Sequence, residues 1–183
     1  MSFLVLIRHA ESIKNVERRQ GGSGATLSAR GLVQCHVVAR FLDSQGFLQD
    51  AFVITHQRPQ TLRTAECIAG KTSLQVCLDE RLRGIDLGVL AGLSKDEARR
   101  LHPESARRLS LWDEGKLCIT RLNIPGAEDA FSFRQRVLEG YWARVVPLLR
   151  LGNVICVFTI GSNTTLPRSY PRLQVLFSVL QAA

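Results

Sequence analysis

The sequence of 183 residues lacks the features that would assign it to several special classes of protein. No apolar run approaches the roughly 18 to 20 residues that a membrane-spanning helix needs. No basic segment precedes the short apolar stretch at the start of the chain, as a secretory signal would require. Internal repeats, low-complexity tracts and linkers are absent as well. We therefore expect one soluble domain over residues 1–183, in the cytoplasm and without membrane contact.

Metal-binding and disulfide patterns are missing too. The five cysteines are scattered and include no C-x-x-C pair. Their neighbours are apolar, since Cys67 precedes Ile68 and Cys156 lies between Ile155 and Val157. An odd number of isolated cysteines in apolar surroundings is typical of reduced, mostly buried thiols. We expect neither a metal nor another cofactor.

The chain is basic, with a formal net charge of +8 and a pI near 9.8. Such a charge suits an anionic ligand, and a nucleic acid is the obvious alternative. The densest group of arginines alternates with acidic and apolar residues, as on a solvated helix face: Arg99, Arg100, Arg107 and Arg108 with Glu97, Glu104, Leu101 and Leu109. This spacing favours a small anionic ligand and argues against a nucleic-acid partner.

Apolar segments of two kinds alternate along the chain. Short continuous runs, typical of strands buried on both faces, occupy residues 3–7, 51–55, 73–78 and 153–159. Helices are predicted from Ser28 to about Ser44 with Val33, Val37, Val38, Phe41 and Leu42 facing inward, from Pro59 through Ile68, from Ser94 toward Leu101, after Pro103, and from about Asp129 to Leu151 with a kink or end at Pro147. This order predicts an α/β fold, a three-layer α/β/α sandwich around a mainly parallel sheet with the first strand at its centre.

Polar residues follow three of the predicted strands. Ligands of parallel sheets bind at the carboxyl ends of the strands, and these ends carry Arg8-His9, Thr55-His56 and Thr159-Ile160. Taken alone, a histidine after a strand is more often a hydrogen-bonded structural residue than a catalytic one. The glycine-rich segment 21–24 lacks the G-K-[ST] ending of a phosphate loop and is interpreted as a flexible loop.

Six motifs occur in order along the chain: LIRHAES-x-x-N (6–15), TLSARG-x-x-Q (26–34), TH-x-R-x-x-x-x-RTAE (55–66), L-x-x-x-D-L-G-x-L-x-G (82–92), IPGAED (124–129) and VFT-x-GSN (157–163). Together they resemble the histidine phosphatase superfamily, in its phosphoglycerate-mutase-like branch, over about residues 3 to 163. The resemblance implies phosphoryl transfer through a covalent phosphohistidine, with His9 as the nucleophile and with Arg8 and Asn15 binding the phosphate. It also implies that selectivity lies in an insertion over about residues 93–127, where Trp112, Lys116 and Arg121 could line the crevice.

Three positions depart from the family's pattern. Gln60 stands where the family has a second phosphate-binding arginine, Gly84 where it has a proton-donating glutamate, and Ile160 where it has a second histidine. Isoleucine can neither donate a hydrogen bond to a phosphoryl group nor titrate. The segment of about residues 164–183 is atypical as well, because Pro167 and Pro171 restrict any helix there.

Three other residues are candidates to compensate. Arg58, at a strand-to-helix turn, could supply the missing cation. His56, where relatives usually carry a serine, could reach the phosphate site if its strand neighbours the first, or else be a surface histidine. Asp86 is the carboxylate closest to Gly84 and a tentative acid.

Two functions remain open. The intact block around His9 favours a weak or specialised phosphomonoester or phosphohistidine hydrolase. Gln60, Gly84 and Ile160 favour a non-catalytic relative that binds a phosphorylated ligand or partner through Arg8 and His9. Mutase activity fits less well than hydrolysis, because a mutase must keep its phosphohistidine away from water.

Overall fold

The computed structural model describes residues 2–70 and 74–158, and the structural statements below concern these residues. Its strands form one four-stranded sheet in the order β1-β4-β2-β3, with every neighbouring pair parallel. The strands are β1 (Leu4–Arg8), β2 (Ala51–Thr55), β3 (Val76–Leu78) and β4 (Asn153–Phe158). The α-helices are α1 (Ile13–Val16), α2 (Ala29–Ser44), α3 (Pro59–Ala69), α4 (Lys95–Leu101), α5 (Pro103–Asp113), α6 (Ala130–Gly140) and α7 (Val146–Leu149), with short 3₁₀ turns at Glu80–Leu82, Gly88–Leu90 and Ile119–Arg121.

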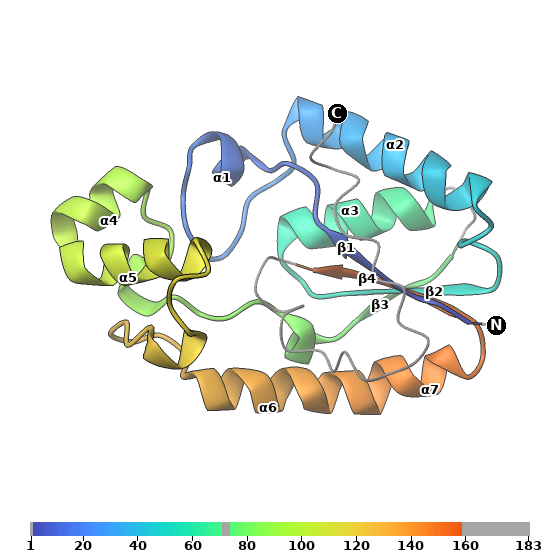
Figure 1. Ribbon diagram of the computed structural model, residues 1–183. Coiled ribbons are helices and arrows are strands. Elements are labelled where there is room, and N and C mark those ends of the chain that lie inside the picture. The colour runs from blue at the N-terminus through green and yellow to red at the C-terminus, as the bar shows by residue number, and fades with distance from the viewer. Residues whose placement is uncertain (1, 71–73, 159–183) are drawn as a thin grey trace.

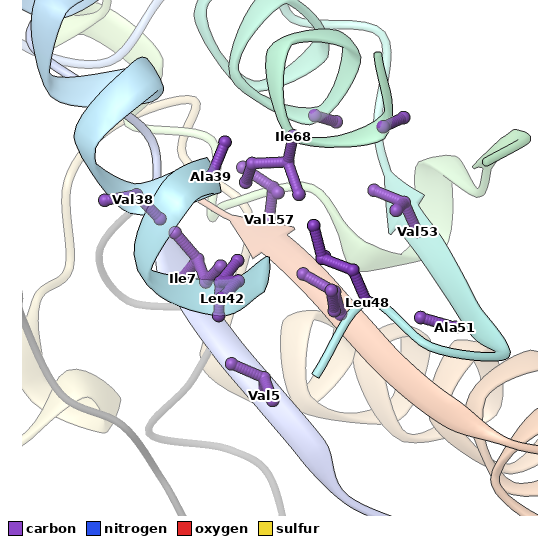
Figure 2. Close-up of a cluster of buried hydrophobic side chains, with 13 residues drawn as sticks. Val5, Ile7, Val38, Ala39, Leu42, Leu48, Ala51, Val53, Ile68 and Val157 are labelled. Atoms are coloured by element: carbon purple, nitrogen blue, oxygen red, sulfur yellow. The ribbon is translucent and has the colours of Figure 1, made fainter. Parts of the chain in front are cut away.

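Helices cover both faces of the sheet (Figure 1), with α2 and α3 on one side and α6 and α7 on the other. Successive side chains of a strand point to opposite faces, so Val5 and Ile7 pack with α2 and α3 (Figure 2). Leu4 and Leu6 belong to the cluster on the opposite face. The predicted three-layer α/β/α sandwich with a parallel sheet is confirmed.

β1 does not lie at the centre of the described sheet, contrary to our expectation. β4 pairs with both β1 and β2, so β1 stands at one end of the described strand order. The strand is apolar throughout because helices cover both of its faces. Strand order depends on pairing between segments at opposite ends of the described chain, which the apolar pattern of one strand does not encode.

Helix α2 begins as predicted, with Ser28 Oγ accepting a hydrogen bond from Gly31 N at 2.9 Å. Its buried face is narrower than predicted. Val38 and Leu42 are buried against the sheet, whereas the side chain of Val33 is exposed, with 63% of the residue's surface accessible. At about 100° per residue, Val33 lies roughly 140° around the helix from Val38, beyond the stripe that faces the core.

The helix predicted over residues 129–151 is interrupted near its end. α6 ends at Gly140, and a π-helical turn over Tyr141–Val145 leads into α7. Pro147 has no N–H, and in a regular helix its ring would clash with the carbonyl of Ala143. The wider turn relieves this conflict and buries Tyr141 completely.

The third strand is shorter than the predicted segment 73–78. It begins at Val76. Ser73 lies outside the described residues, and Leu74 N donates a hydrogen bond to Ala69 O at 3.2 Å rather than to a neighbouring strand. The prediction of mostly buried thiols is wrong: Cys35 and Cys156 are buried, but Cys67 and Cys77 are only half-buried and Cys118 is exposed.

No helix among the described residues is long and apolar enough to cross a lipid bilayer. They also hold no group of three or more histidine, cysteine and acidic side chains arranged to bind a metal ion.

The predicted insertion, residues 93–127, contains α4 and α5 and lies to one side of the sheet (Figure 1). Leu109 of α5 belongs to an apolar cluster that also includes Leu87 and Phe133 of α6. Through this cluster, the insertion packs against α6 of the three-layer core. Ile160 and the segment predicted to be atypical, residues 164–183, lie outside the described residues.

Gly31→Ala tests the close packing between α2 and the segment after β1. A Cβ at residue 31 would overlap the backbone carbonyl of Glu11. We therefore expect the free energy of unfolding to fall by about 1–3 kcal/mol, although alanine is otherwise the better helix former by about 1 kcal/mol. Urea unfolding measures the change. Val33→Ala, on the exposed side of the same helix, is the control and should change stability by less than about 0.5 kcal/mol. A Gly31→Ala variant as stable as the wild type would contradict this packing.

Candidate active site

The site begins at the carboxyl end of β1, where the ladder of the sheet continues for one residue. His9 N donates a hydrogen bond to Phe158 O at 3.0 Å, which holds His9 level with the end of β4. Arg8 is half-buried and His9 is buried. The strand therefore delivers these two residues to the edge where parallel sheets bind ligands.

The residue after His9 is anchored to α3. Ala10 N donates to Thr64 Oγ1 at 3.1 Å, and this hydroxyl donates in turn to Gln60 O at 2.7 Å. Ala10 is completely buried, so its N–H needs such a partner. Thr64 of the RTAE motif thus fixes the backbone next to the imidazole.

The following residue is anchored to α2. Glu11 N donates to Gln34 Oε1 at 2.9 Å, and Ser28 Oγ donates to Glu11 Oε1 at 2.6 Å. Ser28 N also donates to Glu11 O at 3.0 Å, and Gly31 leaves room for this approach. In the motif TLSARG-x-x-Q, Ser28, Gly31 and Gln34 are therefore spaced so that all three contact Glu11, in the segment after His9.

The imidazole of His9 is held in one tautomer. Its Nδ1 lies 2.7 Å from Ala10 O. A carbonyl oxygen can only accept, so Nδ1 carries the proton and Nε2 keeps a free lone pair. A nucleophilic imidazole needs this arrangement.

The pKa of His9 is lowered to about 4. Burial is the largest cause, partly offset by the hydrogen bond to Ala10 O, and the charges of Arg8, Lys14 and Arg58 lower it further. His9 is therefore neutral at physiological pH.

His9 lines a cavity of about 140 Å³. Four cationic side chains line it with His9: Arg8, Lys14, Arg19 and Arg58. The described lining residues include no aspartate or glutamate. Such a cavity attracts an anion and offers it no competing negative charge.

Three of these cations have no carboxylate partner within the described chain. Arg8, Lys14 and Arg58 form no ion pair there, whereas Arg19 pairs with Glu17 at 2.8 Å. Burial lowers the pKa of Arg8 and of Arg58, and burial together with the charge of Arg58 lowers the pKa of Lys14. An anionic ligand would relieve this crowding of positive charge.

Asn15 lines the same cavity, as the resemblance implied. Its Oδ1 accepts hydrogen bonds from Ser12 N at 2.9 Å and from Ser12 Oγ at 2.8 Å. With the oxygen engaged, the amide nitrogen can serve as a donor to a ligand.

Two of the three departures from the family's pattern also line the cavity. Gln60 is buried, and its Oε1 accepts a hydrogen bond from Ala25 N at 3.1 Å. It thereby holds the glycine-rich loop, where Gly24, at φ +100°, leaves room for it. Gly84 is buried in the cavity wall and has no side chain to donate a proton. The third departure, Ile160, lies outside the described residues.

His56 is completely buried at the end of β2 and is not among the residues that line the cavity. Its strand does not neighbour β1, since β4 lies between them. Burial, then the charges of Arg58 and His9, lower its pKa to about 3. Arg58 N donates to its Nδ1 at 3.4 Å, and its Nε2 has no hydrogen-bond partner in the described chain. A compensating role for His56 stays a prediction.

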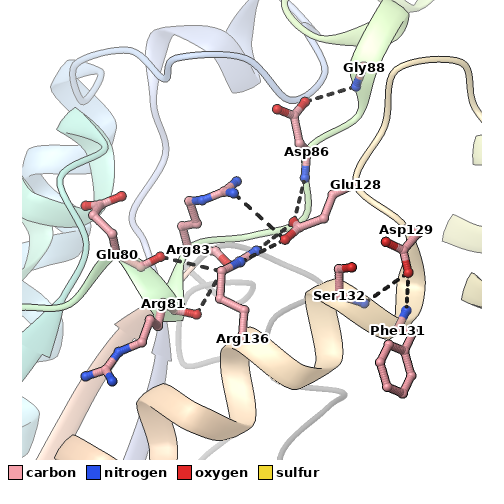
Figure 3. A network of polar contacts seen from close by, with 10 residues as sticks. All are labelled: Glu80, Arg81, Arg83, Asp86, Gly88, Glu128, Asp129, Phe131, Ser132 and Arg136. Carbon is pink, nitrogen blue, oxygen red and sulfur yellow. Dashed lines mark hydrogen bonds and ion pairs between the residues drawn. The ribbon is translucent and has the colours of Figure 1, made fainter.

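Asp86 is exposed, and its carboxylate accepts a hydrogen bond from Gly88 N at 3.0 Å (Figure 3). It lines a neighbouring cavity with Arg58 and Glu80 and does not line the cavity of His9. A role as the acid would require it to reach the substrate from that neighbouring cavity.

Glu128 of the IPGAED motif has a structural role beside the site (Figure 3). Both of its oxygens accept hydrogen bonds from Arg136, at 2.8 and 2.7 Å. Arg136 also donates to the backbone carbonyls of Arg81 and Arg83, at 2.7 and 3.1 Å. This network binds the segment that precedes Gly84 to α6.

Lys14 and Arg19 were missed by the sequence reasoning. Lys14 stands directly before Asn15 in the first motif, and the only signal for either cation was the basic composition of the chain. Of the residues expected from the insertion, Trp112 lines the cavity, whereas Lys116 and Arg121 do not.

Comparison with known proteins agrees with this geometry. The family model of the histidine phosphatase superfamily (branch 1) matches residues 4–157. The chain belongs to the histidine phosphatase superfamily. The resemblance seen in the motifs is thereby confirmed.

Relatives within the superfamily carry the names of mutases and phosphatases. A protein of Yersinia enterocolitica named "Probable phosphoglycerate mutase GpmB" is 41% identical over 86 residues, which are 46% of this chain and 39% of that protein. The chain therefore matches well under half of that relative's length.

Solved structures share the fold over more of the chain. The structure of YhfR from Bacillus stearothermophilus is 27% identical, with a TM-score of 0.71, and the match covers 90% of this chain and 78% of that one. The alpha-ribazole phosphatase from Shigella flexneri shares the fold at 23% identity, with a TM-score of 0.68 over 87% of this chain and 75% of that one.

The low pKa of His9 predicts how its imidazole titrates. We expect a midpoint of about 4 by NMR, because burial and the nearby cations disfavour the protonated ring. The His9→Asn variant assigns the signal. Removing a cation with Arg58→Gln should move the midpoint upward, whereas Arg63→Gln should not, since the exposed Arg63 pairs with Glu66 at 3.2 Å. A His9 midpoint near 6.5, the ordinary pKa of a histidine side chain, would contradict the described burial.

Proposed function

We propose that this chain is a phosphomonoester or phosphohistidine hydrolase that forms a phosphohistidine at His9, with weak or specialised activity. One observation carries the proposal: a neutral, oriented imidazole shares a small cavity with four cations and no described carboxylate. Phosphoryl transfer is catalysed mainly by positioning and by positive charge around the equatorial oxygens. The ligand is accordingly a small, anionic phosphorylated molecule.

In the first step, His9 Nε2 attacks the phosphorus atom. A P–N bond forms, and the P–O bond to the leaving group breaks. The phosphoryl oxygens are stabilised by the positive charges of Arg8, Lys14 and Arg58, and Asn15 orients the phosphoryl group by hydrogen bonding. The Ala10 carbonyl, 2.7 Å from Nδ1, stabilises the positive charge that develops on the ring.

In the second step, water attacks the phosphohistidine. The P–N bond breaks, inorganic phosphate leaves, and His9 returns to its neutral form. No cofactor is needed for either step, because the imidazole is the nucleophile and the protein's own cations supply the charge.

The leaving group poses the main difficulty for this site. The oxygen that departs from phosphorus must be protonated or must be stable as an anion. Gly84 offers no donor, and the described residues lining the cavity include no carboxylic acid. The proton then comes from water, so esters of acidic alcohols, such as aryl phosphates, should react far faster than alkyl phosphates.

Hydrolysis suits this site better than the mutase activity named in the GpmB relative. A mutase must shield its phosphohistidine from water until the phosphoryl group returns to the substrate. Here the small cavity shares lining residues, Arg8 and Trp112 among them, with a wider cavity of about 920 Å³. Water can therefore enter, and water is the acceptor that a hydrolase needs.

A specific observation also supports a second candidate, a non-catalytic protein that binds a phosphorylated ligand or partner. Gln60 and Gly84 stand in the cavity itself, where the resemblance implied an arginine and a proton donor. Binding needs only cations and hydrogen-bond donors, and Arg8, Lys14, Arg58 and Asn15 line the cavity although Gln60 replaces an arginine there.

His9→Ala separates the two candidates. For a hydrolase, we expect the variant to lose about 10³-fold or more in the rate of 4-nitrophenyl phosphate hydrolysis. It should also lose the acid-labile phosphoryl adduct that mass spectrometry of the quenched wild type detects. His36→Ala, at an exposed histidine of α2, is the control and should keep both. Equal rates in the wild type and His9→Ala would overturn the proposed hydrolysis. A silent wild type that binds orthovanadate, more weakly after Arg8→Ala, would establish the binding protein instead.

Gly84→Glu tests the missing proton donor. For a hydrolase we expect kcat/KM for glycerol 3-phosphate to rise by about 10²-fold or more, with a much smaller rise for 4-nitrophenyl phosphate, whose leaving group needs no proton. Gly84→Gln fills the same space without titrating and should leave the ratio of the two rates at its wild-type value. The backbone tolerates a side chain, because Gly84 is not among the described residues with positive φ. Equal gains on both substrates would contradict a missing acid.

A further inference from the structure

The phosphate site opens into a much larger cavity of about 920 Å³. Arg8, Asn15, Leu87 and Trp112 are among the residues that line both cavities, so the two adjoin each other. The larger volume falls within the range of about 300–1,000 Å³ that is typical of sites for organic ligands of drug size. A phosphorylated compound of only a few carbon atoms would leave most of this space unfilled.

The residues that line both cavities combine polar and cationic side chains, Arg8, Asn15 and Arg19, with the apolar Leu87 and the aromatic Trp112. Trp112 of α5 is half-buried there, and Leu87 and Leu109 line the larger cavity beside it. An indole face of this kind binds planar rings by stacking and buries them against aliphatic side chains. The part of a substrate next to its phosphate would contact this wall.

Two cations lie further along the same cavity. Arg18 and Lys95 both line it, and neither lines the cavity of His9. Their backbones are joined, since Lys95 N donates to Arg18 O at 3.2 Å, and Gln20 N donates to Leu93 O at 2.8 Å. Arg18 has a φ of +54°, a conformation that costs energy in a residue with a side chain. The segment around Arg18 is therefore held firmly against the start of α4.

These two cations are free to bind an anion. Two of the three carboxylates that line the cavity already have arginine partners, Glu17 with Arg19 at 2.8 Å and Asp96 with Arg99 at 3.1 Å. Asp113 is the third, and burial raises its pKa although Lys95 is near. Among the described residues, neither Arg18 nor Lys95 forms an ion pair with it or with any other carboxylate.

We infer that the substrate is a phosphomonoester whose organic part combines a planar ring, packed on Trp112, with a second anionic group, bound by Arg18 and Lys95. This inference rests on the proposed function, since it names the class of ester that the same site would hydrolyse. It also agrees with the missing proton donor, because a ring attached to the ester oxygen makes a better leaving group.

Three aryl esters with similar leaving groups test the inference on the full chain: phenyl phosphate, biphenyl-4-yl phosphate and 4′-carboxybiphenyl-4-yl phosphate. We expect the carboxylated ester to exceed the plain biphenyl ester by about tenfold in kcat/KM, since a hydrogen-bonded charge pair contributes about 1.5 kcal/mol. Lys95→Gln and Arg18→Gln should each bring this ratio toward 1. Lys116→Gln, a lysine of the same insertion outside both cavities, should keep the ratio. Trp112→Ala should reduce the advantage of biphenyl over phenyl phosphate, and Trp112→Phe should restore part of it.

The outcomes separate this inference from the proposed function. If aryl phosphates are hydrolysed but the carboxylated ester has no advantage, or keeps it in Lys95→Gln and Arg18→Gln, the inference is wrong and the hydrolase stands. If none of the three is hydrolysed, the proposed activity fails. Calorimetric binding of the corresponding phosphonates then decides the inference alone. Tighter binding of the carboxylated phosphonate in the wild type, lost in Lys95→Gln, would support it, and equal binding would overturn it.

Discussion

A desolvated imidazole among cations is the arrangement on which the rest of the site depends. Burial is the largest cause of the low pKa of His9, and Arg8, Lys14 and Arg58 add to it. Under the proposed function, the charges that attract a phosphoryl group therefore also keep the imidazole that would accept it unprotonated. A carboxylate in the same cavity would oppose both effects, because it would stabilise the imidazolium and repel the phosphate. The fold meets this requirement in two ways. β1 pairs with β4, so His9 is buried where the strand ends. The next two residues are then held by hydrogen bonds to side chains of α3 and α2.

Much of this arrangement could be predicted from the sequence, because local rules and tertiary contacts agree there. The apolar run of β1, the serine cap of α2 and the proline at the start of α3 each predict an element that the structure contains. The short motifs were informative for a physical reason: Ser28, Gln34 and Thr64 donate or accept the hydrogen bonds that fix the backbone after His9. Residues so constrained form a recognisable pattern, on which the resemblance to the family rested. The expectation that Arg8 and His9 reach the ligand edge of the sheet followed from the apolar strand that precedes them.

What could not be predicted depends on contacts between distant segments. The position of β1 at one end of the described sheet follows from its pairing with β4, and the π-helical turn follows from burying Tyr141 just before Pro147. Lys14, on the short helix α1, and Arg19, in the loop after it, reach the cavity through the folding of a segment for which no periodic pattern exists. Gln60 is the most instructive case. The sequence indicated only that an arginine was missing, whereas the structure gives the glutamine a use, because its side-chain oxygen binds the backbone of the glycine-rich loop.

The cavity of His9 keeps some of the groups that the family's pattern contains and lacks others, and this difference determines which phosphate esters could react there. Several groups that would accept a phosphoryl group under the proposed function are present: the oriented imidazole of His9, the cations that line its cavity and Asn15. The position from which the family's acid would assist the departing oxygen is a buried glycine in the cavity wall. Under the proposed function, such a site stabilises the phosphoryl group in the transition state but not the charge that develops on the leaving oxygen, so the substrate itself would have to supply that stabilisation. The wide cavity beside Trp112 is suited to substrates that can do so, because a planar ring that packs there can also delocalise the charge of the departing oxygen. Under the proposed function, the preference for esters with a planar ring and the absence of a proton donor at Gly84 are therefore linked, because such esters need no proton donor.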